Sequence, residues 1–181
     1  MGNVEAAFDP TSAQSLAQLK QLACGFARSL ECDHFSYFLT RLPRGQVPAE
    51  DTFLADYPDE WQARYKQRSY KFYDPVVTIS RTSRLPFYWG GRGFLQPYSK
   101  AERHVFHEAN EYRILEGYGI PTAGPEADSG IFSVIVRHRN LIHEMVAEET
   151  ARLQLFAAQF HDAAVRLIAQ DDRRNPAELT K

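Results

Sequence analysis

Residues 57–89 contain side chains whose types and spacing would suit the binding of a small ligand. Tyr57, Trp61 and Tyr65 recur every four residues, so they share one face of a helix. Tyrosine and tryptophan combine a large apolar ring with one polar group, so such a face can enclose an amphiphile and donate hydrogen bonds to its carbonyls. Asp74, which precedes a proline, only accepts hydrogen bonds when ionised and can take an amide N–H.

The same residues also have structural interpretations, which spacing alone favours. An aromatic stripe at helical spacing usually packs into a core, and an aspartate before a proline usually caps a helix. Other candidate groups are weaker. His104 and His107 lie three residues apart on a predicted helix without an evident third ligand, so solvated or loosely packed side chains are expected there rather than a metal site. Cys24, beside the apolar stripe of the first helix, is interpreted as a packed thiol.

The composition is that of one folded domain. The chain has 181 residues, a formal net charge of −2 and 44% hydrophobic residues. The near-zero charge argues against this segment being the main surface for binding nucleic acid. Two cysteines fit reduced thiols in a cytoplasmic protein, and no apolar run is long enough to cross a membrane. The 12 Phe, 9 Tyr and 2 Trp must fill a core or surround a ligand.

Hydrophobic periodicity and turn signals predict a series of helices and strands. Helices are expected from Asp9 to Leu30, over 58–69, from Asp74 onward, over 99–115 and over 144–170. Strands are expected over 34–42, 52–55, 85–89, 117–122 and 130–138. The last strand is apolar on both faces, so we expect it to be covered on both sides. The short turns between paired strands favour an antiparallel sheet between helices, in the α+β class.

A longer pattern of motifs carries a family resemblance. It consists of YPDEW at 57–61, Tyr65, DPV at 74–76, PFYW at 86–89, FHEA at 106–109, GYGIP at 117–121 and the strand 130–136. This pattern, which covers most of the chain, resembles the autoinducer-binding domain of LuxR-type quorum-sensing regulators. The resemblance implies an α-β-α sandwich, with an antiparallel sheet of about five strands and helices on both faces. It also implies a protein that is not an enzyme, needs no cofactor and binds an N-acyl-homoserine lactone.

The resemblance assigns roles to single residues of this chain. Trp61 matches the residue whose indole N–H holds the lactone carbonyl, and Asp74 matches the carboxylate that accepts the amide N–H. Tyr57 matches a phenol bonded to the acyl carbonyl, and Ser133 looks like a second donor to it. The aromatic walls of the pocket correspond to Tyr65 and Trp89. Further lining positions correspond to Phe38, Thr40, Val76, Val105, Ala109 and Ile114.

The sequence departs from the family pattern in three places, the first of which is the 90–93 loop, which looks longer than in some relatives. Arg113 stands where many members have glycine, and its side chain could face solvent or narrow the mouth of the pocket. Family members usually continue into a helix-turn-helix domain, and residues 177–181 resemble its opening. We therefore expect an autoinducer-binding domain over residues 1–170 and, over 171–181, a linker towards a missing DNA-binding domain. The simplest hypothesis is a chain cut at the domain boundary; a natural short form that blocks a full-length partner in mixed dimers is the alternative.

The predicted function is signal sensing in a transcription regulator. Burial of the lactone would stabilise the domain, favour a homodimer and control DNA binding allosterically, with DNA contacted only by the missing domain. The long last helix is a candidate for part of the dimer face, because Leu155 and Val165 lie off its main apolar stripe. No membrane partner is expected. Three alternatives remain: an enzyme that degrades the lactone, an anti-activator without a ligand, and a receptor for a different signal.

Overall fold

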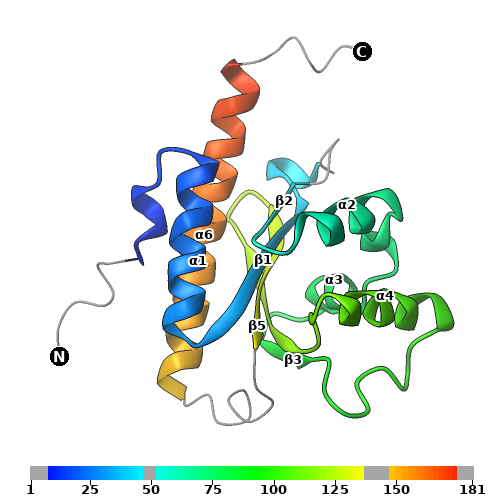
Figure 1. The fold of residues 1–181 in the computed structure, drawn as a ribbon. Helices are drawn as coiled ribbons and strands as arrows, with labels where there is room; N and C mark the ends of the chain where they lie inside the picture. Colours follow the sequence, from blue (N-terminus) through cyan, green and yellow to red (C-terminus); the bar gives the residue numbers. More distant parts are fainter. Residues whose placement is uncertain (1–7, 47–51, 137–146, 175–181) are drawn as a thin grey trace.

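An antiparallel sheet separates two groups of helices in the computed structural model, which describes residues 8–46, 52–136 and 147–174 (Figure 1). Its strands are β1 (Cys32–Arg41), β2 (Phe53–Ala55), β3 (Phe87–Trp89), β4 (Gly117–Ala123) and β5 (Ser129–Val136). They form a five-stranded sheet in the order β2-β1-β5-β4-β3, and every pairing is antiparallel. The central strand of this order, β5, therefore has a neighbour on each side.

The helices cover both faces of the sheet. α1 (Leu16–Ser29) and α6 (Ala147–Arg174) lie side by side against one face, whereas α2 (Asp59–Gln67), α3 (Pro75–Ser80) and α4 (Lys100–Glu111) lie on the other side (Figure 1). The predicted α-β-α sandwich with an antiparallel sheet of about five strands is confirmed. In the described ranges, none of the helices is both long and apolar enough to span a membrane.

The central strand β5 divides its side chains between the two layers, as its sequence predicted. Phe132 and Val134 pack toward α1 and α6, while Ile131 and Ser133 point to the opposite layer. Both sets are buried, because each face of the strand has its own cover of helices. One strand thus contributes to a filled core on one side and to a cavity on the other.

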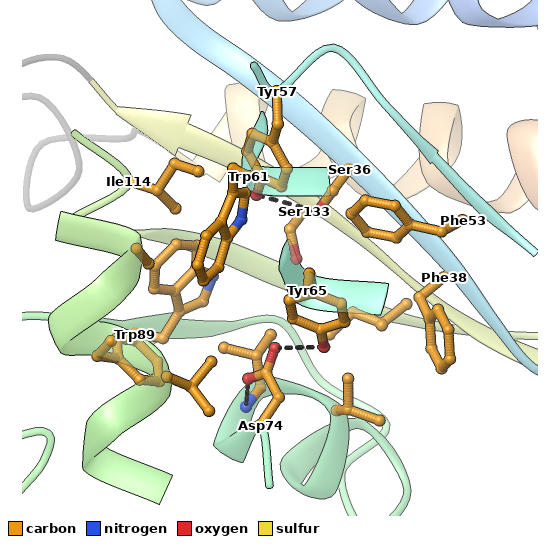
Figure 2. Close-up of a pocket in the computed structure, with 16 residues that line it drawn as sticks. Ser36, Phe38, Phe53, Tyr57, Trp61, Tyr65, Asp74, Trp89, Ile114 and Ser133 are labelled. Atoms are coloured by element: carbon orange, nitrogen blue, oxygen red, sulfur yellow. Dashed lines mark hydrogen bonds between the residues drawn. The ribbon is translucent and has the colours of Figure 1, made fainter. Parts of the chain in front are cut away.

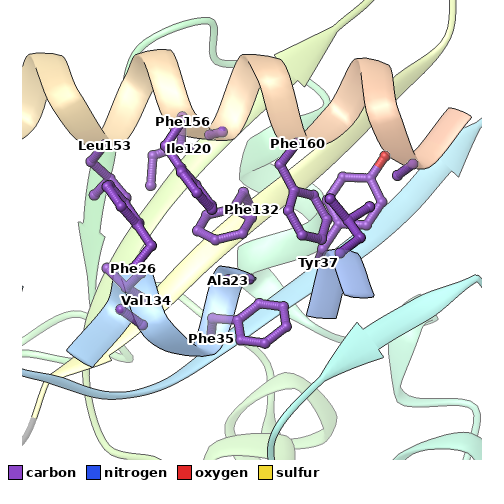
Figure 3. Packing of buried hydrophobic residues seen from close by; sticks show 14 of the residues in the cluster. Ala23, Phe26, Phe35, Tyr37, Ile120, Phe132, Val134, Leu153, Phe156 and Phe160 are labelled. Carbon is purple, nitrogen blue, oxygen red and sulfur yellow. The ribbon is translucent and has the colours of Figure 1, made fainter. Parts of the chain in front are cut away.

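The layer between the sheet and the pair α1 and α6 is filled by aromatic and aliphatic side chains (Figure 3). Phe26 of α1 stacks on Phe156 of α6, with ring centroids 3.8 Å apart. Phe160 of α6 packs between Phe35 of β1 and Phe132 of β5, at centroid distances of 6.0 and 5.1 Å. Burial of each such ring stabilises the fold by roughly 1.5–3 kcal/mol, so this layer supplies much of the stability of the domain.

A cluster of buried polar side chains interrupts this filled core. His161 of α6 is 1% exposed, and its Nε2 lies 2.8 Å from Oδ2 of Asp128. Its Nδ1 lies 2.8 Å from the hydroxyl of Tyr37 and 3.1 Å from the hydroxyl of Thr122. Because a carboxylate only accepts, Nε2 must carry the proton, and Nδ1 of the neutral ring then accepts. Desolvation lowers the pKa of His161, against the opposing effect of Asp128.

Some helix boundaries differ from the sequence-based prediction. Asp9 caps only a 3-10 turn at Pro10–Ser12, and α1 begins after Ser15, whose hydroxyl accepts a backbone N–H. The prediction of a helix from Asp9 was wrong because two capping residues follow one another with extended backbone between them. The last helix continues to Arg174, past its predicted end at residue 170, and its predicted start at residue 144 lies outside the described residues.

α4 ends at Glu111, before the predicted end near residue 115, because the chain turns sharply at Arg113. Arg113 has a φ of 61°, in the left-handed region. The N–H of Ile114 donates to the carbonyl of Ala109, and the N–H of Arg113 donates to that of Asn110. These are the two hydrogen bonds of a Schellman motif, where glycine is usual at the left-handed position. The Arg113 side chain is exposed and does not line the cavity described below, so it faces solvent.

Replacing Arg113 with glycine is expected to raise the free energy of unfolding by about 1 kcal/mol, because glycine adopts the left-handed conformation without steric cost. Urea unfolding of the two proteins measures the change. Arg103→Gly is the control, since Arg103 is exposed in the interior of the same helix. There the substitution should instead lower stability by about 1 kcal/mol. A loss of stability in Arg113→Gly would contradict the assigned backbone conformation.

Candidate ligand-binding site

A cavity lies between the sheet and the layer formed by α2, α3 and α4 (Figure 2). Its volume is about 560 Å³, a figure that includes the part that opens to solvent. Most of its lining is aromatic or aliphatic, and a small number of polar side chains is distributed among these rings. Such a site suits a ligand with a long apolar part and a compact polar part.

Eleven of the twelve residues singled out from the sequence line this cavity. They are Phe38, Tyr57, Trp61, Tyr65, Asp74, Val76, Trp89, Val105, Ala109, Ile114 and Ser133. These residues come from β1, β3, β5, the three helices of this layer and the segments that adjoin them. The fold therefore gathers into one space side chains that are widely separated in the sequence.

Thr40 is the remaining predicted residue, and the structure places it away from the cavity. Its hydroxyl donates to the backbone carbonyl of Ser129 at 2.9 Å. The pairing of β1 with β5 shifts register between Leu39 and Arg41, directly around Thr40. Strict alternation from Phe38 would put Thr40 on the cavity face, but this irregularity near the end of the strand interrupts the alternation.

Five lining residues were missed in the sequence. They are Ser36, Phe53, Val77, Phe106 and Ile131. Alternation along the strands could have found two of them, because Ser36 shares a face with Phe38 and Ile131 shares one with Ser133. Phe53 opens a strand of only three residues, which is too short to show a pattern.

The aromatic stripe of α2 forms one wall of the cavity. Trp61 is 2% exposed, and its ring packs edge-on against Tyr65 with centroids 5.9 Å apart. Tyr65 stacks on Phe53 at 5.6 Å, with the two ring planes only 5° apart. Tyr57 lies just before the helix and enters the same cluster. The stripe is therefore both part of a core and part of a cavity wall.

Asp74 is held in a fixed orientation at the cavity (Figure 2). Its Oδ1 accepts the backbone N–H of Val76 at 2.8 Å, which caps α3, and its Oδ2 accepts the hydroxyl of Tyr65 at 2.8 Å. Burial raises the pKa of this carboxyl, while the hydrogen bonds from Tyr65 and the α3 backbone oppose the rise. Each oxygen has capacity for a further donor, so the carboxylate is a preoriented acceptor.

Hydroxyl groups gather on the sheet side of the cavity. The Tyr57 hydroxyl donates to Oγ of Ser36 at 3.2 Å. Ser36 of β1 lies directly opposite Ser133 of β5 in the antiparallel pairing, and both line the cavity. Burial raises the pKa of Tyr57 well above its ordinary value, so its phenol stays protonated and keeps its donor. This part of the cavity can therefore donate hydrogen bonds to a carbonyl oxygen.

Trp89 of β3 lines the same cavity as Trp61 (Figure 2). It pairs with Gly117 of β4, and a Cβ atom added to Gly117 would lie 2.7 Å from the indole and 2.2 Å from the carbonyl oxygen of Val134. Only glycine therefore lets the indole pack directly on β4. The Trp89 indole nitrogen is buried and has no hydrogen-bond partner within the described part of the chain.

Charged side chains link α2 to α4 next to the aromatic wall that α2 forms. Nη1 of Arg64 lies 2.8 Å from Oε2 of Glu111, and its guanidinium lies 5.2 Å from the ring centroid of Tyr112. The Tyr112 ring in turn packs on Trp61 at 5.6 Å. On α4, Nε2 of His104 lies 3.0 Å from Oε1 of its neighbour Glu108. In the ranges that the structure describes, no three His, Cys, Asp or Glu side chains are grouped so that they could hold a metal ion.

Comparison with known proteins identifies relatives over most of the chain. A family model described as the autoinducer binding domain matches residues 15–164. The chain is 29% identical over 125 residues to the transcriptional activator protein RaiR of Rhizobium etli. This alignment covers 68% of the chain and 50% of RaiR. It is 24% identical over 162 residues to the transcriptional activator protein AhyR of Aeromonas hydrophila, and this alignment covers 87% of the chain and 60% of AhyR. The chain thus spans about half the length of the curated relatives it matches.

Solved structures share the fold. SdiA of Escherichia coli aligns with a TM-score of 0.73 at 17% identity, over 90% of this chain and 66% of SdiA. CepR2 of Burkholderia cenocepacia is described as an N-acylhomoserine lactone dependent LuxR family transcription factor. It aligns with a TM-score of 0.66 at 18% identity, over 91% of this chain and 93% of CepR2. At these identities the likeness establishes the arrangement of helices and strands alone.

Proposed function

Because this chain belongs to the autoinducer-binding domain family of LuxR-type transcriptional regulators, whose members bind signals rather than catalyse reactions, we propose that its cavity binds an N-acyl-homoserine lactone. One observation carries the proposal: a carboxylate, an indole and several hydroxyls line one cavity with aromatic walls. The proposed ligand has one amide N–H, two carbonyl oxygens and an apolar acyl chain. Asp74 complements the N–H, and the donors complement the carbonyls.

In this proposal Asp74 fixes the amide of the ligand. Its two oxygens are held by Val76 and Tyr65, so the carboxylate does not have to reorganise when the ligand arrives. A hydrogen bond to an ionised acceptor contributes about 1.5–3 kcal/mol. The affinity of the site should therefore depend more on Asp74 than on any neutral donor.

The remaining polar groups serve the two carbonyls. Trp61 N–H would donate to the lactone carbonyl, and Tyr57 with Ser133 would donate to the acyl carbonyl. The Tyr57 hydroxyl donates to Ser36 in the structure, so it would turn toward the acyl carbonyl when the ligand binds. The acyl chain would then lie among Phe38, Val76 and the aromatic wall.

The function is tested by thermal unfolding with a panel of N-acyl-homoserine lactones of graded chain length. A ligand at a hundred times its dissociation constant stabilises by about 2.7 kcal/mol, which corresponds to a rise in Tm of roughly 5–10 °C. The ring-opened N-acyl-homoserines are the matched control, since they keep the chain and amide but lose the lactone. No shift with any lactone would refute the proposal.

Two further measurements address the alternative functions. Mass spectrometry after incubation should recover the lactone intact, whereas its loss would indicate a degrading enzyme. SdiA has been solved in complex with octanoyl-rac-glycerol, another acyl chain on a polar head, so octanoyl-glycerol belongs in the panel. A shift with octanoyl-glycerol alone would identify a receptor for a different signal. A protein that ignores the whole panel would support an anti-activator without a ligand.

Replacing Trp61 with phenylalanine should weaken lactone binding by on the order of 1 kcal/mol or more, because it keeps the ring but removes the N–H donor. Isothermal titration with the best ligand of the panel measures this loss. Tyr118→Phe is the control, because Tyr118 belongs to β4 but packs on the opposite core. Unchanged affinity in Trp61→Phe would show that the lactone contact has been assigned to the wrong residue.

We also propose that residues 1–170 form the signal-binding unit of a dimeric regulator and that 171–181 lead to a separate DNA-binding domain. Leu155 of α6 is 57% exposed and supports a dimer face on this helix, whereas Val165 packs partly against the core. Ligand burial would stabilise this unit and so favour the dimer. Sedimentation of the protein with and without lactone tests this, and a monomer under both conditions would count against it.

A further inference from the structure

The side chain of Trp89 carries a polar group that the proposed ligand contacts leave unused. The chain has two tryptophans, and both line the cavity, with Trp61 2% and Trp89 3% exposed. The resemblance gives Trp89 the role of an apolar wall only. Its Nε1, however, is buried without a hydrogen-bond partner. Burying an unpaired donor is unfavourable, so a native structure that keeps one usually does so for a reason.

The packing around Trp89 prevents its indole from turning to find a protein acceptor. One face of the ring lies against Gly117, where even a Cβ atom would come within 2.7 Å. Phe106 of α4 packs edge-on at 5.9 Å, with an interplanar angle of 71°. The nearby carboxylate of Glu116 is bonded to Tyr88, the neighbour of Trp89 in β3, whose side chain packs toward the opposite core. The indole is therefore locked in place with its donor unpaired.

The unpaired nitrogen is turned toward the polar part of the cavity. Trp61 and Trp89 line the same cavity as Asp74, and in Figure 2 the nitrogen of Trp89 is on the side of the ring that faces Asp74. A ligand acceptor in this part of the cavity would satisfy the orphaned N–H.

We propose that Trp89 is a second hydrogen-bond donor to the lactone carbonyl of the signal. This proposal rests on the proposed function. A carbonyl oxygen has two lone pairs and can accept from both indoles at once. Trp89 then selects for the lactone head group, because a ring without that carbonyl would leave two buried donors unpaired instead of one. Trp89 becomes a specificity-determining residue and not only a wall.

Nuclear magnetic resonance tests this on the unaltered protein. A chain with two tryptophans gives two indole N–H signals, which a Trp61→Phe spectrum assigns. The probes are N-octanoyl-homoserine lactone and N-octanoyl-cyclopentylamine, which has the same chain, amide and ring size but no lactone oxygens. Lactone should move both indole protons downfield, and the cyclopentyl amide should move neither. A downfield shift of the Trp61 signal alone would overturn the proposal.

Binding measurements provide a second, independent test. Trp89→Phe should weaken binding of the octanoyl lactone roughly fivefold to tenfold more than it weakens binding of the cyclopentyl amide, because both probes lose ring contact but only the lactone loses a hydrogen bond. An equal loss of affinity for both probes would show that Trp89 contributes only as an apolar wall and would overturn the proposal. If neither probe nor any lactone of the panel binds the unaltered protein, the proposed function itself fails, which is a distinct outcome.

Discussion

Asp74→Asn is expected to weaken binding of the signal strongly while making the ligand-free protein more stable. Asparagine can still cap α3 through its carbonyl oxygen, so the local fold is kept. It removes the charge-assisted hydrogen bond and presents an N–H₂ group near the ligand amide, which should cost about 1.5–3 kcal/mol of binding, or roughly a tenfold to hundredfold loss of affinity. Titration with the best lactone measures the affinity, and urea unfolding measures the stability.

The gain in stability follows from the direction of the pKa shift of Asp74. Burial raises its pKa in the folded state, so the folded protein holds this proton more tightly than the unfolded chain does. The contribution of Asp74 to stability is therefore most favourable below the unfolded pKa and is lost as the pH rises through the folded pKa. Asp74→Asn removes this penalty, so its stability advantage should be largest at neutral pH and shrink on acidification.

Asp56→Asn provides a control of opposite sign. Burial of Asp56 opposes ionisation, but the ion pair with His34, whose Nδ1 lies 3.5 Å from Oδ1, and the hydrogen bond from the N–H of Phe35 outweigh it and lower the pKa of this carboxyl. Asp56 lies outside the cavity lining, so its replacement should lower stability at neutral pH and leave lactone affinity unchanged. If Asp74→Asn bound the lactone as tightly as the unaltered protein, the proposed amide contact would be wrong.

His161→Leu should lower the free energy of unfolding by about 3–5 kcal/mol, because it leaves the carboxylate of Asp128 buried without its partner. Tyr37→Phe is the comparison within the same cluster. It removes one hydrogen bond to Nδ1 while Thr122 keeps the other, so about 1 kcal/mol is expected. Urea unfolding at neutral pH measures both variants. A loss of less than about 1 kcal/mol in the free energy of unfolding of His161→Leu would show that the buried carboxylate of Asp128 does not need His161 as its partner.

This cluster also predicts an acid sensitivity. Desolvation lowers the pKa of His161 in the folded state, so the unfolded chain binds this proton more readily. The stability that neutral His161 contributes is present above the unfolded pKa of about 6.5 and declines as the pH falls below it. The double variant His161→Leu, Asp128→Asn should recover part of the lost stability, since it no longer buries an unpaired charge.

The sequence predicted the layers well because the evidence for them is local. Apolar residues on both faces of residues 130–138 required cover on two sides, and the structure places helices on both. The capping box at Ser99 and the cap at Asp74 mark helix starts that the structure confirms. The predicted end of α4 was wrong because the helix ends where Arg113 adopts a left-handed conformation. Glycine is usual at such a position, so an arginine gives no sequence signal for it.

The polar arrangements were harder to predict because their members are far apart in the chain. His161 bonds to Asp128, 33 positions away, and to Tyr37, 124 positions away. The local signal was a histidine in the apolar stripe of the last helix. A buried histidine requires a hydrogen-bond partner, but the sequence does not indicate which residue supplies it. Alternation from Phe38 could have identified Ser36 as a lining residue, but its position opposite Ser133 depends on strand pairing that no local pattern gives.

The placement of both tryptophans in the cavity has a practical consequence. No other part of the chain contains an indole, so ultraviolet emission excited at long wavelength comes from this cavity and from nowhere else. The filled layer under α1 and α6, with its many phenylalanines, is dark in the same experiment. The two tryptophans thus provide an intrinsic fluorescent probe of this cavity, which needs no label and does not respond to changes in the filled layer on the other side of the sheet.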